Sequence, residues 1–308
     1  MKNKNENPDN LCVALDCAIR DSEKEKYGYT SGYIVRDSDT KYSNYMSNEA
    51  WKEYLENMAE EHRKQYKDGN GEELKEKKGR WGIVPPKMAS FGSSSRFIYE
   101  LSKDVSGYVF EVKLDTHVGG VANLDGFLHK ENNYVYVEAK RREIYGSSHE
   151  NEKIKSVYIP VYEKIKNNCK GFKYEQNDCK EPNMKKITFC INDTPIKYFD
   201  LKQLICHFLG ITYDIAKNNI QNAKVTFLYL IYDPNEVCKF IAPKYKKEIK
   251  DRYESVKKFV SDNKDVINSI FQTLLQYQKE TYNLADLKID FDFKMVSQKD
   301  YNKELPSC

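Results

Sequence analysis

The residues best suited to chemistry lie in two neighbouring strand-like segments. Glu138 and Lys140 are separated by one residue in the run YVYVEAK, and Asp125 lies in the preceding apolar run. Residues two apart on a strand point to the same face, so Glu138 and Lys140 share one. A simple hairpin between the two segments lays Asp125 beside Glu138. The sequence therefore predicts two carboxylates and one ammonium group at the end of a sheet.

Two carboxylates and a lysine suit the hydrolysis of a phosphodiester. Carboxylates hold Mg²⁺, which neutralises the charge that develops on the phosphate and lowers the pKa of the attacking water. We expect Asp125, Glu138 and the backbone carbonyl of Ala139 to bind Mg²⁺, for which Mn²⁺ can substitute. We expect Lys140 to position the attacking water or to help deprotonate it. The alternative is a surface salt bridge, because charges pair routinely across hairpins.

An acid two residues before a lysine occurs eleven times in this chain. Most of these pairs begin in helical, solvated or loop segments. Glu111 begins one on a strand, but its nearest upstream acid is Asp104 at a helix end, which makes a poor metal partner. Asp292 and Lys294 share a strand face late in the chain, where no further helix and strand follow. Of the candidates on strands, Glu138 is the one with an acid on the preceding strand and a helix and a strand after it.

Periodicity and turn residues predict the elements that position these side chains. In chain order they are an amphipathic helix over 48–67, a helix over 89–104, strands over 108–115, 121–129 and 134–140, a helix over 152–168, a loop over 169–183, a strand over 185–192, a helix that Asp200 caps and Gly210 stops, a buried strand over 225–232, a long helical region over 244–282 and a strand over 287–296. Residues 1–46 show only weak periodicity. The middle of the chain therefore runs helix, three strands, helix, strand.

The string LDGFLHKENNYVYVEAK, with Asp125, Glu138 and Lys140, resembles the active-site signature of the PD-(D/E)XK nuclease superfamily. The element order over residues 89–232 is similar to the αβββαβ core of that superfamily, with an insertion after the third strand. Leu124 stands where the signature has proline. The resemblance implies a restriction endonuclease-like fold, which is a mixed four-stranded sheet flanked by helices. It also implies Mg²⁺-dependent cleavage of DNA that leaves a 5′-phosphate.

The resemblance extends to two further positions. Many members carry a metal-supporting Glu on the first core helix, where Glu100 lies here, and the alternative is a solvated helix residue. Exonuclease-like branches carry a Gln on the helix after the third strand, where Gln203 lies. His207 shares its face, since residues four apart on a helix are neighbours. The alternative for both is the polar face of an amphipathic helix.

Several basic residues are candidate contacts to substrate phosphates. Arg96 follows three serines at a predicted helix start, which can bind a phosphate or simply cap the helix. Arg141 and Arg142 directly follow the motif, and neighbours on a strand face opposite ways, so one of them is expected to be a plain surface charge. His207 is the fourth candidate. The remaining histidines, including His149, lack ligand spacing and are expected to be structural or exposed.

Composition bounds the remaining possibilities. The 308 residues carry a net charge of only +3, which argues against a histone-like nucleic-acid binder, and 13% aromatic content argues against general disorder. The polar start MKNKNENPDN lacks the apolar run of a secretory leader, and no stretch is long enough to span a membrane. Eight scattered cysteines without a CxxC pair predict reduced thiols and a cytoplasmic protein. The gaps between Cys169, Cys179 and Cys190 lack the short ligand pairs of zinc sites.

These observations divide the chain into three regions. Residues 1–87 form an N-terminal, partly helical extension, and residues 88–235 form the core with an insertion at about 145–199. Residues 236–308 form a C-terminal helical region with a final strand, packed on the core. We expect a nuclease with DNA as its partner, no membrane association, and a homodimer left open. The alternative is a nucleic-acid-binding or assembly module of the same fold without activity.

Overall fold

The computed structural model describes residues 11–28, 45–69, 73–79, 82–146, 149, 152–284 and 288–306. The first ten residues, where the sequence predicts no secretory leader, lie outside these ranges, as does Leu287, the first residue of the last predicted strand. Among the described helices, none combines the length and the apolar composition that crossing a bilayer requires.

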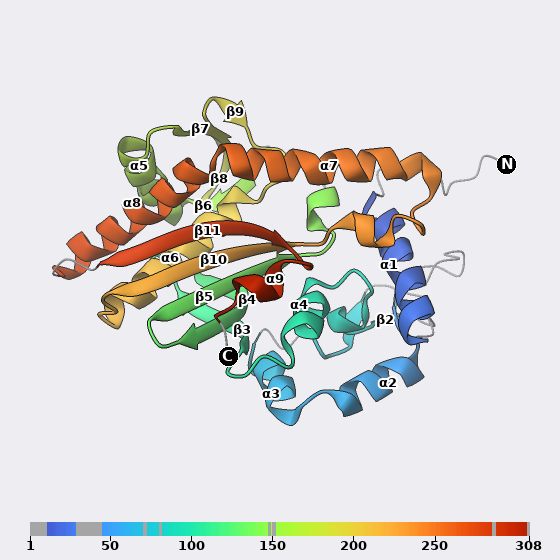
Figure 1. The fold of residues 1–308 in the computed structure, drawn as a ribbon. Helices are drawn as coiled ribbons and strands as arrows, with labels where there is room; N and C mark the ends of the chain where they lie inside the picture. Colours follow the sequence, from blue (N-terminus) through green and yellow to red (C-terminus); the bar gives the residue numbers. More distant parts are fainter. Residues whose placement is uncertain are drawn as a thin grey trace.

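A five-stranded mixed sheet lies at the centre of the molecule (Figure 1). Its strands are β3 (Val109–Asp115), β4 (Val121–Lys130), β5 (Asn133–Lys140), β10 (Ala223–Ile231) and β11 (Ile289–Ser297). The first three form an antiparallel meander, and β10 and β11 add to it in parallel, giving the spatial order β11-β10-β5-β4-β3. Two short turns make antiparallel neighbours, whereas a parallel neighbour needs a longer crossover. The sequence predicts every one of these strands.

Helices cover both faces of the sheet, as Figure 1 shows. On one face α6 (Leu201–Lys217) packs against β3 and β4, and α8 (Lys264–Tyr282) packs against α6 and β11. On the other face α4 (Ser94–Ser102) packs against β4 and β5. The predicted α/β class, a mixed sheet flanked by helices, is confirmed.

The helix α6 continues seven residues past Gly210, to Lys217, so the prediction that Gly210 stops it is wrong. A Cβ atom added at Gly210 would lie 2.8 Å from Ala122 Cβ and 2.9 Å from Leu114 Cβ. Both of those atoms are fixed to strand backbone and cannot swing away. Glycine is therefore present at this position because it lets the helix approach the sheet closely, and not because it ends the helix.

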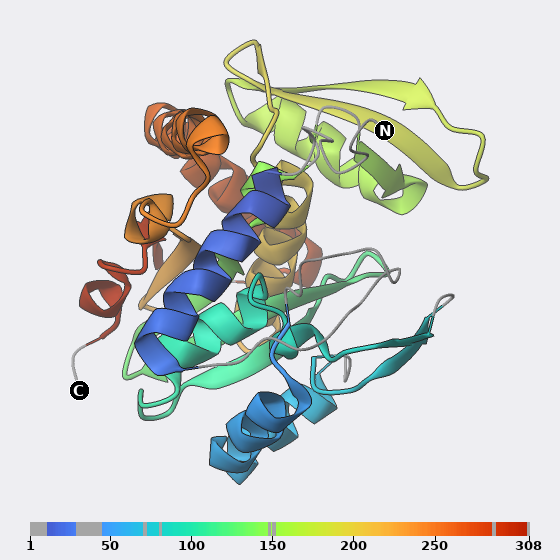
Figure 2. The same cartoon turned by 90° about the vertical axis from the view of Figure 1, so that its right-hand side faces the viewer.

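The insertion after the third strand forms a sheet of its own, which Figure 2 shows at the opposite end of the molecule from α2 and α3. Its elements are β6 (Glu152–Lys155), α5 (Ile159–Asn168), β7 (Phe172–Asp178), β8 (Met184–Ile191) and β9 (Thr194–Pro195). Two predictions are corrected here: β6 precedes a shorter helix within 152–168, and the expected loop over 169–183 contains β7. Phe172 and Tyr174 alternate with exposed residues, so β7 forms by pairing with β8.

The N-terminal extension contains α1 (Leu11–Tyr27), α2 (Asn48–Asn57), α3 (Glu60–Asp68), β1 (Lys77–Gly79) and β2 (Gly82–Val84). The sequence does not predict α1, which lies where the periodicity is weak. It predicts one helix over 48–67, but the chain breaks at Met58, which has extended backbone and a side chain that is 2% exposed. Burial of this side chain in the core accompanies the break between the two helices.

The remaining helices are α7 (Pro243–Asp262), α9 (Tyr301–Glu304) and the 3₁₀ turns η1 (Lys87–Ala89), η2 (Glu143–Tyr145), η3 (Ser156–Tyr158) and η4 (Pro234–Val237). The long helical region over 244–282 is in fact two helices, α7 and α8, which meet at Asn263. The helix predicted from residue 89 begins at Ser94. Its N-cap is Ser93, whose hydroxyl accepts a hydrogen bond from Arg96 N at 3.1 Å.

Candidate functional site

Glu138 is a buried residue, 4% exposed, and its carboxylate is the centre of a compact polar network. Lys140 Nζ lies 2.7 Å from Glu138 Oε1, and Gln203 Nε2 donates to the same oxygen at 2.8 Å. His207 Nε2 lies 3.1 Å from the other oxygen, Oε2. Lys140 Nζ also donates to Gln203 Oε1, which closes a triangle of three side chains. The structure thus brings together four of the residues that the sequence singles out.

Two elements position this network. Glu138 and Lys140 lie at the end of β5 on the face that α6 covers. Asp200 caps α6 by accepting a hydrogen bond from Gln203 N at 2.8 Å, which fixes the first turn of the helix. One turn later His207 lies on the same side of α6. The cap therefore fixes the position of Gln203 relative to the end of β5.

The charges of the network are strongly coupled. Burial alone would raise the pKa of Glu138, but Lys140 and His207 outweigh it and lower that pKa to about 2. Burial would lower the pKa of Lys140, but the carboxylate of Glu138 raises it well above its usual range. At neutral pH the pair is a carboxylate and an ammonium group. In this state Lys140 acts through its positive charge and its hydrogens, and does not accept a proton.

Asp125 lies on β4 beside this pair. The last paired residues of β4 and β5 are Gly126 and Val137, so Asp125 and Glu138 are next in register. Asp125 Oδ2 accepts a hydrogen bond from Ala139 N at 2.7 Å, which ties its side chain to β5. Its pKa is raised well above the usual range, first by burial and then by the charges of Glu138 and Glu111.

Glu111 also belongs to this site, although its sequence neighbours do not predict a metal-binding role for it. The pairs Phe110 with Gly126 and Val112 with Leu124 place it opposite Asp125. Its backbone is left-handed, with φ 56°, in the middle of β3, which is uncommon for a residue other than glycine. Burial and then the charge of Glu73 raise its pKa to about 7, with a smaller contribution from Glu138. The short β3–β4 turn is the signal in the sequence that could have found it.

Glu100 does not reach the site. It is exposed on α4 and pairs with Lys103 at 2.9 Å. The residue of α4 that faces the acids is Ser95, whose Oγ lies 3.5 Å from Glu111 Oε1. Five residues along a helix correspond to a rotation of about 140°, so Ser95 and Glu100 point in different directions. The acid beside Asp125 is therefore Glu111 from β3, and not Glu100 from α4 as expected.

The arginines expected to contact phosphates are engaged by α1. Arg96 and Arg141 both pair with Glu23, at 2.8 Å and 2.6 Å, and their side chains are 1% and 6% exposed. Arg142 pairs with Asp16 and keeps 41% of its side chain exposed. As the molecule stands, Arg96 and Arg141 are internal ion-pair partners, so Arg142 is the one of the three that solvent reaches readily.

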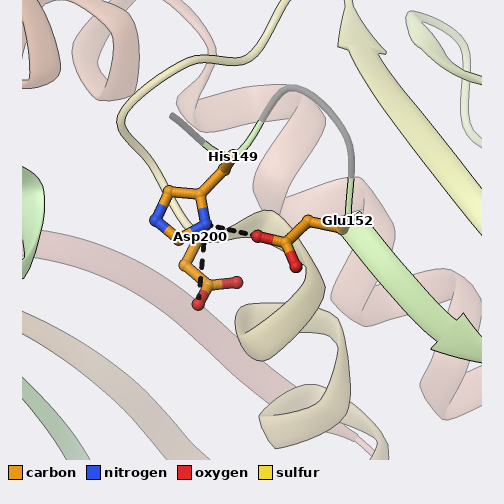
Figure 3. A group of neighbouring side chains, drawn as sticks. All are labelled: His149, Glu152 and Asp200. Atoms are coloured by element: carbon orange, nitrogen blue, oxygen red, sulfur yellow. Dashed lines mark hydrogen bonds and ion pairs between the residues drawn. The ribbon is translucent and has the colours of Figure 1, made fainter. Parts of the chain in front are cut away.

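A cavity of about 390 Å³ adjoins Lys140 and Gln203. His149 and Asp200 also line it, and Figure 3 shows His149 between the carboxylates of Glu152 and Asp200. His149 Nδ1 lies 2.5 Å from Glu152 Oε1 and 4.0 Å from Asp200 Oδ2. Within the described residues, this is the one group with three ligand atoms within 4.8 Å of one another.

The group around His149 is already satisfied without a metal. Glu152 accepts from Lys202 Nζ as well as lying against His149, and these contacts lower its pKa to about 2. Asp200 is the N-cap of α6. We therefore describe it as an ion-pair cluster at the cavity. His149, expected to be structural or exposed, is half-buried in it.

The donor set at Asp125 and Glu138 fits a hard cation such as Mg²⁺. Asp125 is half-buried, and the hydrogen bond from Ala139 N to its Oδ2 holds the carboxyl group beside β5. Mg²⁺ is commonly held by one or two carboxylates, with water and substrate oxygens completing its shell. Asp125 and Glu138 supply two carboxyl groups at neighbouring register positions, and a bound cation would favour the ionised form of Asp125, whose pKa is otherwise raised by burial and by Glu138.

No protein-family model, curated protein or solved structure matches this chain.

Proposed function

We propose that the chain is a Mg²⁺-dependent nuclease that cleaves DNA. The observation that carries the proposal is the buried contact of Glu138, Lys140 and Gln203, with Asp125 next to it on the neighbouring strand. A surface salt bridge, the alternative explanation, would be exposed and would need no glutamine. Here the Lys140 and Glu138 side chains are 9% and 5% exposed. Burying a charged pair costs desolvation free energy, so a buried pair favours a role other than stability.

The order of the elements supports the same proposal. The segment from α4 to β10 runs helix, three antiparallel strands, helix and a parallel strand, with the insertion after β5. This is the αβββαβ order of the restriction endonuclease-like fold, to which we assign the core. In that arrangement the end of β5 and the start of α6 meet, and the four polar residues gather at that junction.

The residues divide the chemistry between them. Asp125, Glu138 and the carbonyl of Ala139 would hold Mg²⁺, which supplies positive charge to the phosphate and acidifies water when it is bound. Lys140 holds the attacking water and stabilises negative charge on the phosphate through its ammonium group, and Gln203 fixes the direction of that group. The attacking water gives one proton to solvent, and its oxygen forms the new bond to phosphorus as the bond to the 3′-oxygen breaks. The 3′-oxygen takes one proton from solvent, giving 5′-phosphate and 3′-hydroxyl ends.

Purified protein with Mg²⁺ or Mn²⁺ should cleave DNA, and Lys140→Ala and Glu138→Ala should each abolish cleavage. The chain offers a matched control in Lys294→Ala, since Asp292 and Lys294 repeat the same spacing on β11 of the same sheet. This control should cleave at the wild-type rate. Linear, circular and single-stranded DNA, together with RNA, distinguish the substrate classes and separate an endonuclease from an exonuclease.

Persistence of cleavage in either site variant would overturn the assignment. Binding of DNA without cleavage by the wild-type protein, in either metal, would instead favour the alternative, an inactive nucleic-acid-binding module. Thermal unfolding of each variant must accompany the assay, because Glu138 without Lys140 is a buried unpaired charge.

A further inference from the structure

The cavity of about 390 Å³ beside Lys140 lies where the insertion joins the core. Lys140 and Tyr229 line it from the neighbouring strands β5 and β10. Tyr198 and Asp200 line it from the segment that leads into α6. One water molecule occupies about 30 Å³ in the liquid, whereas pockets that bind small organic molecules measure about 300–1,000 Å³. The cavity is therefore large enough for an organic group and larger than a single ion or water needs.

Tyr198 gives the cavity a fixed aromatic surface. The guanidinium carbon of Arg252, on α7, lies 4.3 Å from the centre of the Tyr198 ring. Arg252 is itself held in place, since its Nη1 donates hydrogen bonds to Tyr145 O at 2.8 Å and to Gly146 O at 3.2 Å. The half-buried Tyr198 ring is thus supported by Arg252 on one face, and other parts of its surface line the cavity. A flat aromatic group stacks well on such a ring.

Asp200 supplies a hydrogen-bond acceptor to the same cavity. Its Oδ1 accepts the capping hydrogen bond from Gln203 N at 2.8 Å. Its other oxygen, Oδ2, lies 4.0 Å from His149 Nδ1, which is beyond hydrogen-bonding distance (Figure 3). Carboxylate oxygens accept hydrogen bonds and do not donate them. Asp200 therefore favours an occupant that presents an amino group.

Lys140 joins the cavity to the proposed chemistry. Its Nζ lies 2.7 Å from Glu138 Oε1 and also donates to Gln203 Oε1, and both Lys140 and Gln203 line the cavity. An occupant of the cavity therefore lies beside the phosphate that Lys140 is proposed to stabilise. In a nucleic acid, the group joined to that phosphate through one sugar is a base.

We propose that the cavity binds the base of the nucleotide next to the cleaved phosphate and selects a base with an exocyclic amino group. The placement beside the cleaved phosphate rests on the proposed function. The base stacks on Tyr198, and its amino group donates to Asp200 Oδ2. Adenine, cytosine and guanine carry such a group, whereas thymine has none. The base enters from a single strand or after rotating out of a duplex, where it is otherwise stacked between its neighbours.

The test is the affinity of the full-length protein for labelled single-stranded hexanucleotides in EDTA, measured by fluorescence anisotropy. The probes are the adenine, cytosine and thymine homohexamers and a hexamer of abasic residues, all with the same number of phosphates. Wild-type protein should bind the adenine and cytosine hexamers more tightly than the thymine hexamer, and the abasic hexamer most weakly. Equal affinities for the four probes would overturn the proposal, since binding would then depend on phosphates alone.

Tyr198→Ala should weaken binding of the adenine and cytosine hexamers by about 5- to 150-fold, the range for loss of a base–aromatic stack, and leave the abasic hexamer unchanged. The matched control is Tyr245→Ala. Tyr245 is half-buried on α7, has Lys244 Nζ 4.9 Å from its ring centre, and is not among the residues that line the cavity. This control should match wild type. An equal loss for all four probes in Tyr198→Ala would indicate a structural role and contradict the proposal.

Asp200→Asn tests the hydrogen bond while keeping the helix cap, because Asn and Asp cap helices about equally well. With its oxygen on Gln203 N, the new side chain presents an amino group to the cavity, which suits a thymine oxygen. The order of affinities should therefore shift toward the thymine hexamer. The control is Asp233→Asn, since Asp233 caps η4 by accepting from Asn235 N at 2.9 Å, and it should keep the wild-type order. An unchanged order in Asp200→Asn would overturn the selection of an amino group.

The outcomes distinguish this proposal from the proposed function, because binding in EDTA does not require cleavage. Base-selective binding that Tyr198→Ala abolishes, without cleavage of any nucleic acid, would keep the base site and overturn the nuclease. Cleavage of DNA with equal affinities for the four hexamers would do the reverse. Where cleavage occurs, a thymine strand with a single cytosine should be cut at a phosphate next to that cytosine, and cuts spread evenly along the strand would contradict the placement of the site.

Discussion

The acid chosen from the first core helix and the acid found in the structure differ for a simple geometric reason. Glu100 lies in the predicted helix, but the helix turns it away, while Glu111 enters from β3 opposite Asp125. Sequence spacing identified Glu138 and Lys140 because a strand alternates faces whatever it packs against. The direction of a helix residue depends on how the whole helix sits on the sheet.

Gln203 is the residue whose role is most specific to this geometry, since it contacts both Lys140 and Glu138. Gln203→Leu keeps the size of the side chain but removes both hydrogen bonds. We expect cleavage to slow by about 10- to 100-fold, as is typical when the partner that orients a site residue is lost. The measurement is the single-turnover cleavage rate, together with a thermal scan.

The same substitution at Gln272, exposed on α8, is the control and should leave the rate unchanged. A Gln203→Leu variant with the wild-type rate would show that Lys140 is oriented by Glu138 alone.

The element that most alters the expected site is α1. Its Glu23 pairs with Arg96 and Arg141, and its Asp16 pairs with Arg142. The three arginines expected to bind phosphate therefore hold α1 against the core. Arg141 also stacks within 5.5 Å of the Phe97 ring on α4. Their burial suits them to holding α1 in place.

Glu23→Gln should therefore be strongly destabilising, because it leaves two buried guanidinium groups without a carboxylate. Loss of one partner of a buried ion pair costs about 3–5 kcal/mol. Glu25→Gln on the same helix is the matched control: Glu25 pairs with Lys239, both side chains are more than half exposed, and the expected cost is about 0–1 kcal/mol. Urea unfolding measures both. Equal costs for the two variants would mean that α1 is not held by these arginines.

At the scale of the whole molecule, segments far apart in sequence complete one sheet and one core. The last strand, β11, pairs in parallel with β10 along its full length, and Tyr301 near the C-terminus donates to Tyr108, the residue before β3. At the other end of the chain, α1 buries Asp16 completely. Because Asp16 is buried only in the folded state, its ionisation affects the free energy of unfolding of the whole protein.

The buried carboxyl group of Asp16 makes the free energy of unfolding depend on pH. Burial, partly offset by Arg142, raises its pKa from 3.8 to about 6. The folded protein therefore keeps the proton up to about pH 6, whereas the unfolded chain loses it near pH 4. Between these values the folded state binds more protons, so the contribution of Asp16 to stability falls as pH rises, by about 3 kcal/mol in total.

Asp16→Asn cannot ionise and should lack this component. We expect the free energy of unfolding of the variant, relative to wild type, to improve by about 3 kcal/mol between pH 4 and pH 7. Ser22→Ala, on the same helix, removes a group that does not ionise and should show no such trend. A constant difference between wild type and Asp16→Asn across this range would contradict the prediction.

The sequence by itself determined the strands of the central sheet and the residues at the end of β5. Alternation and continuous apolar runs are local patterns, and a strand shows them wherever it lies in the fold. The sequence also placed Gln203 and His207 on one side of α6, since their spacing is that of one helical turn.

Only the tertiary structure decided the rest. The break at Met58, the pairing of β7 with β8 and the passage of α6 through Gly210 depend on packing against segments distant in the chain. The same is true of Glu111, which the pairing of β3 with β4 places opposite Asp125. A sequence lists charges in one dimension, but which of them are buried, and which meet, is set by contacts across the fold.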